Sequence, residues 1–103
     1  MIRVLALYPN TPGKRFDADY YAKKHIPLAL SLVGGACKGS GLMTVDAGVI
    51  PAAPPAHRAI AWFDFESAEA FQSAFGPHAA TILADTPNFT DLEPTIVFGE
   101  IRA

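Results

Sequence analysis

The stretch Arg58-Ala59-Ile60-Ala61-Trp62-Phe63-Asp64-Phe65 decides how this chain folds. Its aromatic and β-branched residues favour a strand, in which successive side chains point to opposite faces of a sheet. One face then carries Ile60 and Trp62, and the other carries Ala59, Ala61, Phe63 and Phe65. Apolar residues on both faces predict a strand that is covered on both sides.

The other strands are expected around this one. Residues 2–8 repeat the two-sided apolar pattern, and residues 95–101 close the chain as another strand. Residues 36–49 predict a weaker strand, because Gly39 and Gly41 interrupt it. Residues 51–56 are predicted to form a proline-rich loop.

The first helix is predicted over residues 17–33. Tyr21, His25, Leu28 and Leu32 recur at the spacing of one helical stripe. Asp17 is suited to cap the start, and the pair Gly34-Gly35 to stop the helix. Pro27 has no backbone N–H to donate to the Lys23 carbonyl, so we expect a kink just after His25.

The second helix is predicted to begin after Ser67, which is suited to cap it. Its apolar stripe also contains a histidine, which follows a proline directly, at Pro77-His78. The stripe consists of Phe71, Ala74, Phe75, His78, Ala79 and Ile82.

The order β-α-β-β-α-β predicts an α+β, ferredoxin-like subunit with an antiparallel four-stranded sheet and two helices on one face. The opposite sheet face is apolar and has no helix to cover it. We expect that face to be buried against a second copy of the chain, which makes the protein a homodimer with a barrel between its sheets.

Composition sets further limits. The 103 residues are expected to form a single domain over 1–103, and 50% of them are hydrophobic while 17% are charged. A net charge of -2 without a basic run argues against nucleic acid and against an anionic membrane surface as partners. A single cysteine, Cys37, allows no internal disulfide, and no stretch is long enough to span a bilayer, so we expect a cytoplasmic protein.

His25 is the residue most suited to chemistry, because an inward-facing imidazole beside a cavity can act as general acid or base. The alternative is a core histidine bonded to a backbone carbonyl, and the same two interpretations apply to His78. Tyr8, Tyr21 and Trp62 are candidates to shape a substrate pocket, although aromatic residues at these spacings also serve as plain core. The sequence has no glycine-rich phosphate loop, no metal-ligand spacing and no motif for an organic cofactor, so we expect no cofactor.

Three segments resemble one known family. The segment 16–28 contains a tyrosine pair followed by His-Ile-Pro-Leu, and segments 71–78 and 85–94 add further similarity. Together they resemble the EthD-like family of the dimeric α/β barrel superfamily. The resemblance implies a ferredoxin-like subunit that dimerises through its sheet, and it transfers the family histidine to His25.

The resemblance implies a fold more specifically than it implies a reaction. EthD-like proteins are associated with oxidoreductase activity, and relatives in the superfamily include cofactor-free monooxygenases, cyclases, decarboxylases and isomerases. We therefore expect a cofactor-independent enzyme acting on a small apolar or aromatic metabolite, with His25 as acid or base. The alternatives are a non-catalytic accessory or metabolite-binding protein of a degradation pathway, and haem binding through His25 or His78.

Overall fold

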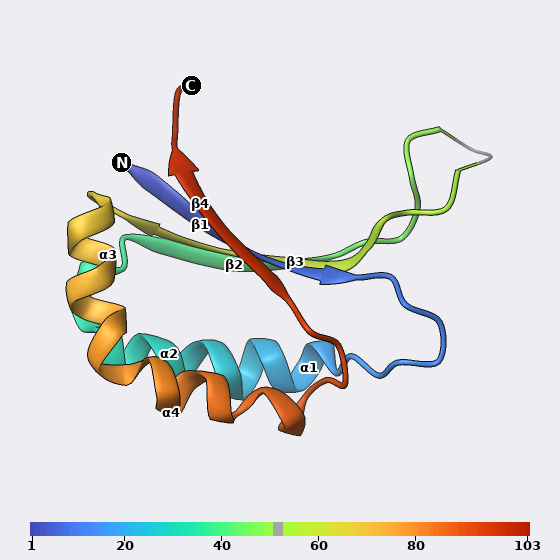
Figure 1. Cartoon of the computed structure of the whole chain (residues 1–103), viewed down its shortest axis with the longest axis horizontal. Coiled ribbons are helices and arrows are strands. Elements are labelled where there is room, and N and C mark those ends of the chain that lie inside the picture. Colours follow the sequence, from blue (N-terminus) through green and yellow to red (C-terminus); the bar gives the residue numbers. More distant parts are fainter. Residues whose placement is uncertain (51–52) are drawn as a thin grey trace.

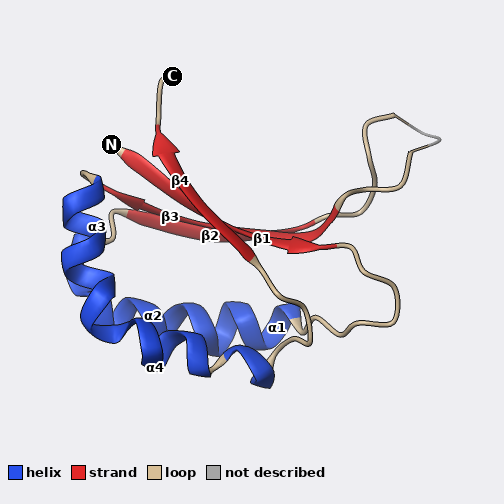
Figure 2. Ribbon diagram, in the orientation of Figure 1, coloured by secondary structure: helices blue, strands red, loops and turns tan. Residues whose placement is uncertain are grey.

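One antiparallel sheet of four strands carries all the described helices on a single face, as Figure 1 and Figure 2 show. The structure is a computed structural model that describes residues 1–50 and 53–103. The strands are β1 (Ile2–Pro9), β2 (Gly39–Thr44), β3 (His57–Phe65) and β4 (Thr95–Glu100), in the spatial order β2-β3-β1-β4. The predicted ferredoxin-like α+β fold is confirmed.

The strand register confirms which residues share a face. Val4 pairs with Phe63 and Ala6 with Ala61, and these residues face the helices. Leu5 pairs with Trp62, and this pair lies on the opposite side of the sheet. The sheet is therefore apolar on both faces, and only one of them is covered by helices.

The predicted strand over residues 36–49 was too long at both ends. Ala36 belongs to a short 3₁₀ turn, η2 (Gly34–Ala36), and the ladder with β3 ends at the pair Thr44 and Ala59. Beyond that pair one more backbone bond joins Val45 to Arg58. The predicted proline-rich loop falls partly on residues 51–52, which lie outside the described residues.

The first helix runs through three segments, α1 (Ala18–Tyr20), the π-helical η1 (Tyr21–His25) and α2 (Ile26–Val33). The predicted ends are confirmed, because the Asp17 carboxylate accepts a bond from the backbone N–H of Tyr20 and Gly34 ends α2 with a φ of 64°.

The first helix is irregular at the turn before Pro27, where the kink is predicted. The backbone N–H of Ile26 bonds to the carbonyl of Tyr21, five residues back, so the turn before the proline is widened. A wider turn leaves more room for a ring that would clash with a carbonyl in a regular helix. His25 ends this widened turn and its side chain is buried.

The second helix bends in the middle. It consists of α3 (Ala68–Phe75), the 3₁₀ turn η3 (Gly76–His78) and α4 (Ala79–Ala84), with the Ser67 hydroxyl capping α3 as predicted. In Figure 1, α3 stands at one end of the sheet while α4 runs alongside α2. The bend falls at Gly76-Pro77, within the stripe predicted from the sequence.

The core between sheet and helices has two buried clusters. One gathers around Tyr21 and Phe89, and the other around Val4 and Phe65. After α4 the chain passes through a last 3₁₀ turn, η4 (Thr86–Asn88), before it returns to the sheet as β4. Among residues 1–50 and 53–103, we find no helix with the length and apolar character required to cross a bilayer.

Candidate functional site

A cavity of about 80 Å³ lies between the sheet and the helices. Its walls come from three strands, from η1 and α2, and from both halves of the bent helix. Leu83 and Ile96 form part of the wall and are about half exposed, at 46% and 47%, so this side opens to solvent. The polar side chains in the wall are those of Tyr8, Tyr21, His25 and Thr86.

His25 joins this cavity to a buried polar network. The residue is only 6% exposed, and its ring packs against those of Tyr21 and Phe89, with ring centroids 4.8 and 4.7 Å away. Its Nδ1 lies 2.8 Å from Oδ2 of Asp85. Within the described part of the chain no hydrogen-bond partner exists for Nε2, which leaves that nitrogen available to the cavity.

Asp85 follows α4 and accepts hydrogen bonds from three side chains. The Tyr20 hydroxyl donates to Oδ1 at 2.8 Å and the Asn88 amide donates to the same oxygen at 2.9 Å, while His25 contacts Oδ2. Burial alone would raise the pKa of Asp85, but the bonds from Asn88, His25 and Tyr20 outweigh it and hold the pKa below its ordinary value. The hydrogen bond between Tyr20 and Asp85 raises the pKa of Tyr20. Asp85 is therefore a carboxylate at neutral pH.

Asp85 fixes the proton arrangement of the neutral His25 ring. A carboxylate can only accept hydrogen bonds, so the proton of a neutral imidazole lies on Nδ1. The lone pair is then on Nε2, the nitrogen that faces the cavity. This arrangement replaces the predicted alternative, in which His25 bonds to a backbone carbonyl.

Tyr8 and Tyr21 place two phenol groups beside His25. Their rings meet edge to face at 5.8 Å, and both residues are almost completely buried. Burial raises the pKa of Tyr21, and it raises the pKa of Tyr8 as well, although the neighbouring Tyr21 hydroxyl opposes that effect at Tyr8. Both phenols are consequently neutral and able to donate a hydrogen bond.

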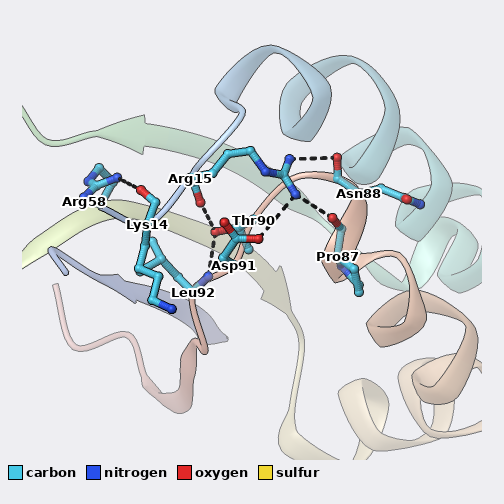
Figure 3. A network of polar contacts seen from close by, with 8 residues as sticks. All are labelled: Lys14, Arg15, Arg58, Pro87, Asn88, Thr90, Asp91 and Leu92. Carbon is cyan, nitrogen blue, oxygen red and sulfur yellow. Dashed lines mark hydrogen bonds and ion pairs between the residues drawn. The ribbon is translucent and has the colours of Figure 1, made fainter. Parts of the chain in front are cut away.

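Two arginines hold the loops that assemble this network, as Figure 3 shows. Arg15 donates to the carbonyls of Pro87 at 2.6 Å and Asn88 at 3.3 Å. Arg58 donates to the carbonyl of Lys14 at 2.6 Å and to the carbonyl of Thr11, in the same loop, at 2.9 Å. The β1–α1 loop is thereby tied to the turn that carries Asn88.

The structure corrects the prediction that Trp62 shapes the pocket. Trp62 lies on the sheet face away from the helices, where its indole covers Gly41 and lies 5.9 Å from the Arg3 guanidinium. The two-fold alternation of the strand puts its neighbour Phe63 on the cavity side instead.

His78 also lies outside the cavity wall. It is half-buried at the end of η3, where the bend after Phe75 turns the chain away from the predicted stripe. Phe75 and Ile82 on either side of the bend do line the cavity. The structure thus brings together His25, Tyr8 and Tyr21, and it separates Trp62 and His78 from them.

The partners of His25 were not among the predicted site residues. Asp85 bonds to the imidazole, Tyr20 and Asn88 donate to Asp85, and the Phe89 ring packs against the imidazole at a tilt. Asp85 is 60 residues from His25, so helical periodicity gives no signal for the contact. The one available signal was the polar turn 85–88 directly after the second helix.

The site fits neither a metal ion nor haem. The described residues contain no group of three side chains that could hold a metal ion. A haem macrocycle is far larger than a cavity of about 80 Å³, and His78 does not reach that cavity.

Solved structures show how widely this architecture occurs. An EthD-like protein from Ralstonia eutropha JMP134 is 39% identical over 96% of this chain and 89% of its own, with a TM-score of 0.89. An EthD family protein from Bacillus halodurans C-125 is 14% identical over 99% of both chains, with a TM-score of 0.68. A dimeric ferredoxin-like protein from Thermobifida fusca YX is 18% identical over 97% of this chain and 90% of its own, with a TM-score of 0.55.

The family itself follows from the sequence match. No curated protein shows significant similarity to the chain. The model of the EthD domain matches residues 14–93, a range that includes His25, Asp85 and the helices that build the cavity. The chain therefore belongs to the EthD family.

Proposed function

We propose that this protein is a cofactor-independent enzyme that moves a proton on a small apolar or aromatic molecule, with His25 as the acid and base. The observation that carries the proposal is the His25–Asp85 pair, whose free nitrogen faces a largely apolar cavity. The oxidoreductase reaction that the family resemblance implies stays a prediction.

The proposed mechanism uses the two edges of the imidazole ring separately. His25 accepts the substrate proton at Nε2, and the carboxylate of Asp85 stabilises the resulting imidazolium through Nδ1. His25 then returns the proton to the substrate or releases it to water. Asp85 acts as a positioning residue, because it contacts His25 and is not part of the cavity wall.

The active unit in this proposal is a homodimer. The sheet face opposite the helices, here called the outer face, presents six apolar side chains, of which Met43 and Val97 are nearly half exposed. The outer face consists of Leu5, Leu7, Met43, Ile60, Trp62 and Val97. An apolar face of this kind is stable in water when a second copy covers it.

The proton-transfer proposal is tested by hydrogen exchange into small carbon acids. Cyclohexanone and resorcinol are incubated in D₂O, and the loss of their exchangeable C–H signals is followed by NMR. We expect the protein to accelerate exchange in at least one probe and His25→Ala to abolish the acceleration. His78→Ala is the matched control, because His78 lies outside the cavity. Equal rates for the unchanged protein and His25→Ala would contradict an acid–base role.

The alternative is a non-catalytic protein that holds an apolar metabolite, and the almost entirely apolar cavity wall favours it. Such a protein needs the cavity but no titrating group. It predicts that a molecule co-purified with the protein from cells is retained by His25→Ala at equal affinity. A molecule that accumulates unchanged on His25→Ala and as product on the unchanged protein would favour the enzyme.

A further inference from the structure

The geometry points to a phenol of a single ring as the ligand of this cavity, with its hydroxyl at Nε2 of His25. This inference rests on the proposed function and narrows its substrate class. The assignment of a phenol depends on three observations: the chemistry of the cavity wall, the hydrogen-bonding needs of the polar groups in that wall, and the size of the cavity.

The wall suits an uncharged aromatic ring. No Asp, Glu, Lys or Arg side chain among the described residues lines the cavity, so an ionised ligand would lose its hydration without gaining a counter-charge. Four phenylalanines supply much of the wall, and their rings can pack edge to face or offset against a flat aromatic guest. They are Phe63, Phe65, Phe71 and Phe75.

The polar groups of the cavity wall require a specific partner. His25 offers a lone pair at Nε2 and therefore needs a donor on the ligand. Tyr8 and Tyr21 offer phenolic O–H groups and therefore need an acceptor. A ligand hydroxyl satisfies both requirements with one oxygen, whereas an ether or a ketone can only accept.

The polar atoms of His25, Tyr8 and Tyr21 are available to bond to a ligand. In residues 1–50 and 53–103 every deeply buried side-chain nitrogen and oxygen has a hydrogen-bond partner. Within the same ranges no hydrogen-bond partner exists for Nε2 of His25 or for the hydroxyls of Tyr8 and Tyr21. These atoms therefore reach the open space of the cavity, where a ligand can bond to them.

The size limits the ligand to about one ring. An apolar cavity of roughly 150 Å³ is enough to enclose one benzene ring. The cavity of about 80 Å³ is smaller, so it encloses at most one ring, which must extend into the open side of the wall. A substituent can extend past Leu83 and Ile96, where the wall is open.

The chemistry that follows is a balanced proton transfer. Nε2 of His25 takes the hydroxyl proton, the electron pair of the O–H bond stays on the ligand oxygen, and the tyrosine hydroxyls donate to the phenolate that forms. Imidazolium and phenolate return to the neutral pair when the proton moves back, so the step needs no co-reactant.

The test compares binding of phenol, anisole, toluene and benzoate by calorimetry. We expect phenol to bind about tenfold more tightly than anisole or toluene, since one good hydrogen bond is worth on the order of 1 kcal/mol. Benzoate is expected to bind most weakly. Tyr21→Phe and Tyr8→Phe should each reduce the preference for phenol over toluene severalfold without changing toluene affinity, and His78→Ala should change neither.

Several results would overturn the phenol assignment. Anisole as tight as phenol, benzoate as tight as phenol, or no binding of any of the four would each do so. The proposed function has a separate readout, because NMR of ¹⁵N-labelled histidine shows directly whether Nε2 of His25 carries the lone pair. A lone pair there with no preference for phenol would overturn the ligand class alone, while a proton on Nε2 in neutral His25 would contradict the acid–base proposal as well.

Discussion

Asp85 is the residue on which the orientation of His25 depends. Its carboxylate, only 11% exposed, receives hydrogen bonds from Tyr20, Asn88 and His25 at 2.8 to 2.9 Å. These bonds are formed with a charged acceptor, which makes each of them stronger than a bond between neutral groups.

Replacing Asp85 with Asn should destabilise the protein in a pH-dependent way. The folded-state pKa of Asp85 is lowered, so its carboxylate stabilises the fold above its ordinary pKa of about 3.9, and this stability is lost as the pH falls through the lower folded value. We expect Asp85→Asn to lower the free energy of unfolding by about 1–3 kcal/mol at pH 7. Urea unfolding at pH 7 and near pH 3 measures the effect.

The difference between the two proteins should shrink in acid, because the unchanged protein loses the carboxylate there and Asn has no proton to gain. Asp46→Asn is a suitable control, since Asp46 is exposed in the segment after β2. A difference that stays constant between pH 7 and pH 3 would show that packing, not charge, explains the loss.

A second prediction concerns the stability of a variant at Gly41. A Cβ at Gly41 would overlap the Trp62 indole, so Gly41→Ala forces the indole to move. We expect a loss of about 1–3 kcal/mol in the free energy of unfolding, measured by thermal or urea denaturation. Gly35→Ala is the matched control, because nothing lies within 4 Å of its Cβ and its φ is not positive. Equal stability of the two variants would contradict the expected clash.

The secondary-structure elements set the position of the site through their irregularities. The widened turn η1 and the bend at η3 are the points at which the helices depart from regular geometry. His25 lies at the end of η1, within the first helix, and Asp85 directly follows α4. Their contact therefore depends on how the turn after α4 is held against the first helix. Arg15 is the side chain that links the two loops.

Arg15→Ala should loosen the segment that follows Asp85. It removes two hydrogen bonds to backbone carbonyls, so we expect a loss of about 1–2 kcal/mol and faster amide exchange at Asn88 and Phe89. The ion pair of Arg15 with Asp91 is exposed and 3.7 Å long, so Asp91→Asn should cost less than about 0.5 kcal/mol. If Asp91→Asn has the larger effect, the ion pair and not the carbonyl bonds holds the loop.

At the scale of the whole molecule, the outer face predicts self-association. Val97 lies on this face with 43% of its surface exposed. Val97→Lys would place a charge from each copy within the proposed interface, where burial of like charges is unfavourable. We expect the unchanged protein to sediment as a dimer and Val97→Lys as a monomer in analytical ultracentrifugation.

Val49→Lys is the control for that experiment, because Val49 is 99% exposed and lies outside the outer face. It should leave the dimer intact. A dimer that survives Val97→Lys would place the contact on another surface, and an unchanged protein that sediments as a monomer would contradict the dimer altogether.

The sequence by itself determined the fold class and the faces of the strands. Alternation in residues 58–65 is enough to assign Trp62 and Phe63 to opposite sides of the sheet, because the two-fold period of a strand is local. The caps Asp17 and Ser67 were predictable for the same reason, since each bonds to a residue three positions away.

Only the tertiary structure decided which side chains form the site. The strand period separated Trp62 from Phe63, but only the assembled layers show that the helices cover the side of Phe63. The bend at Gly76-Pro77 removed His78 from the cavity wall, and the return of the chain after α4 brought Asp85 to His25 across 60 residues. Such contacts arise from the packing of distant elements against one sheet, and hydrophobic periodicity, which reports only on near neighbours, carries no information about them.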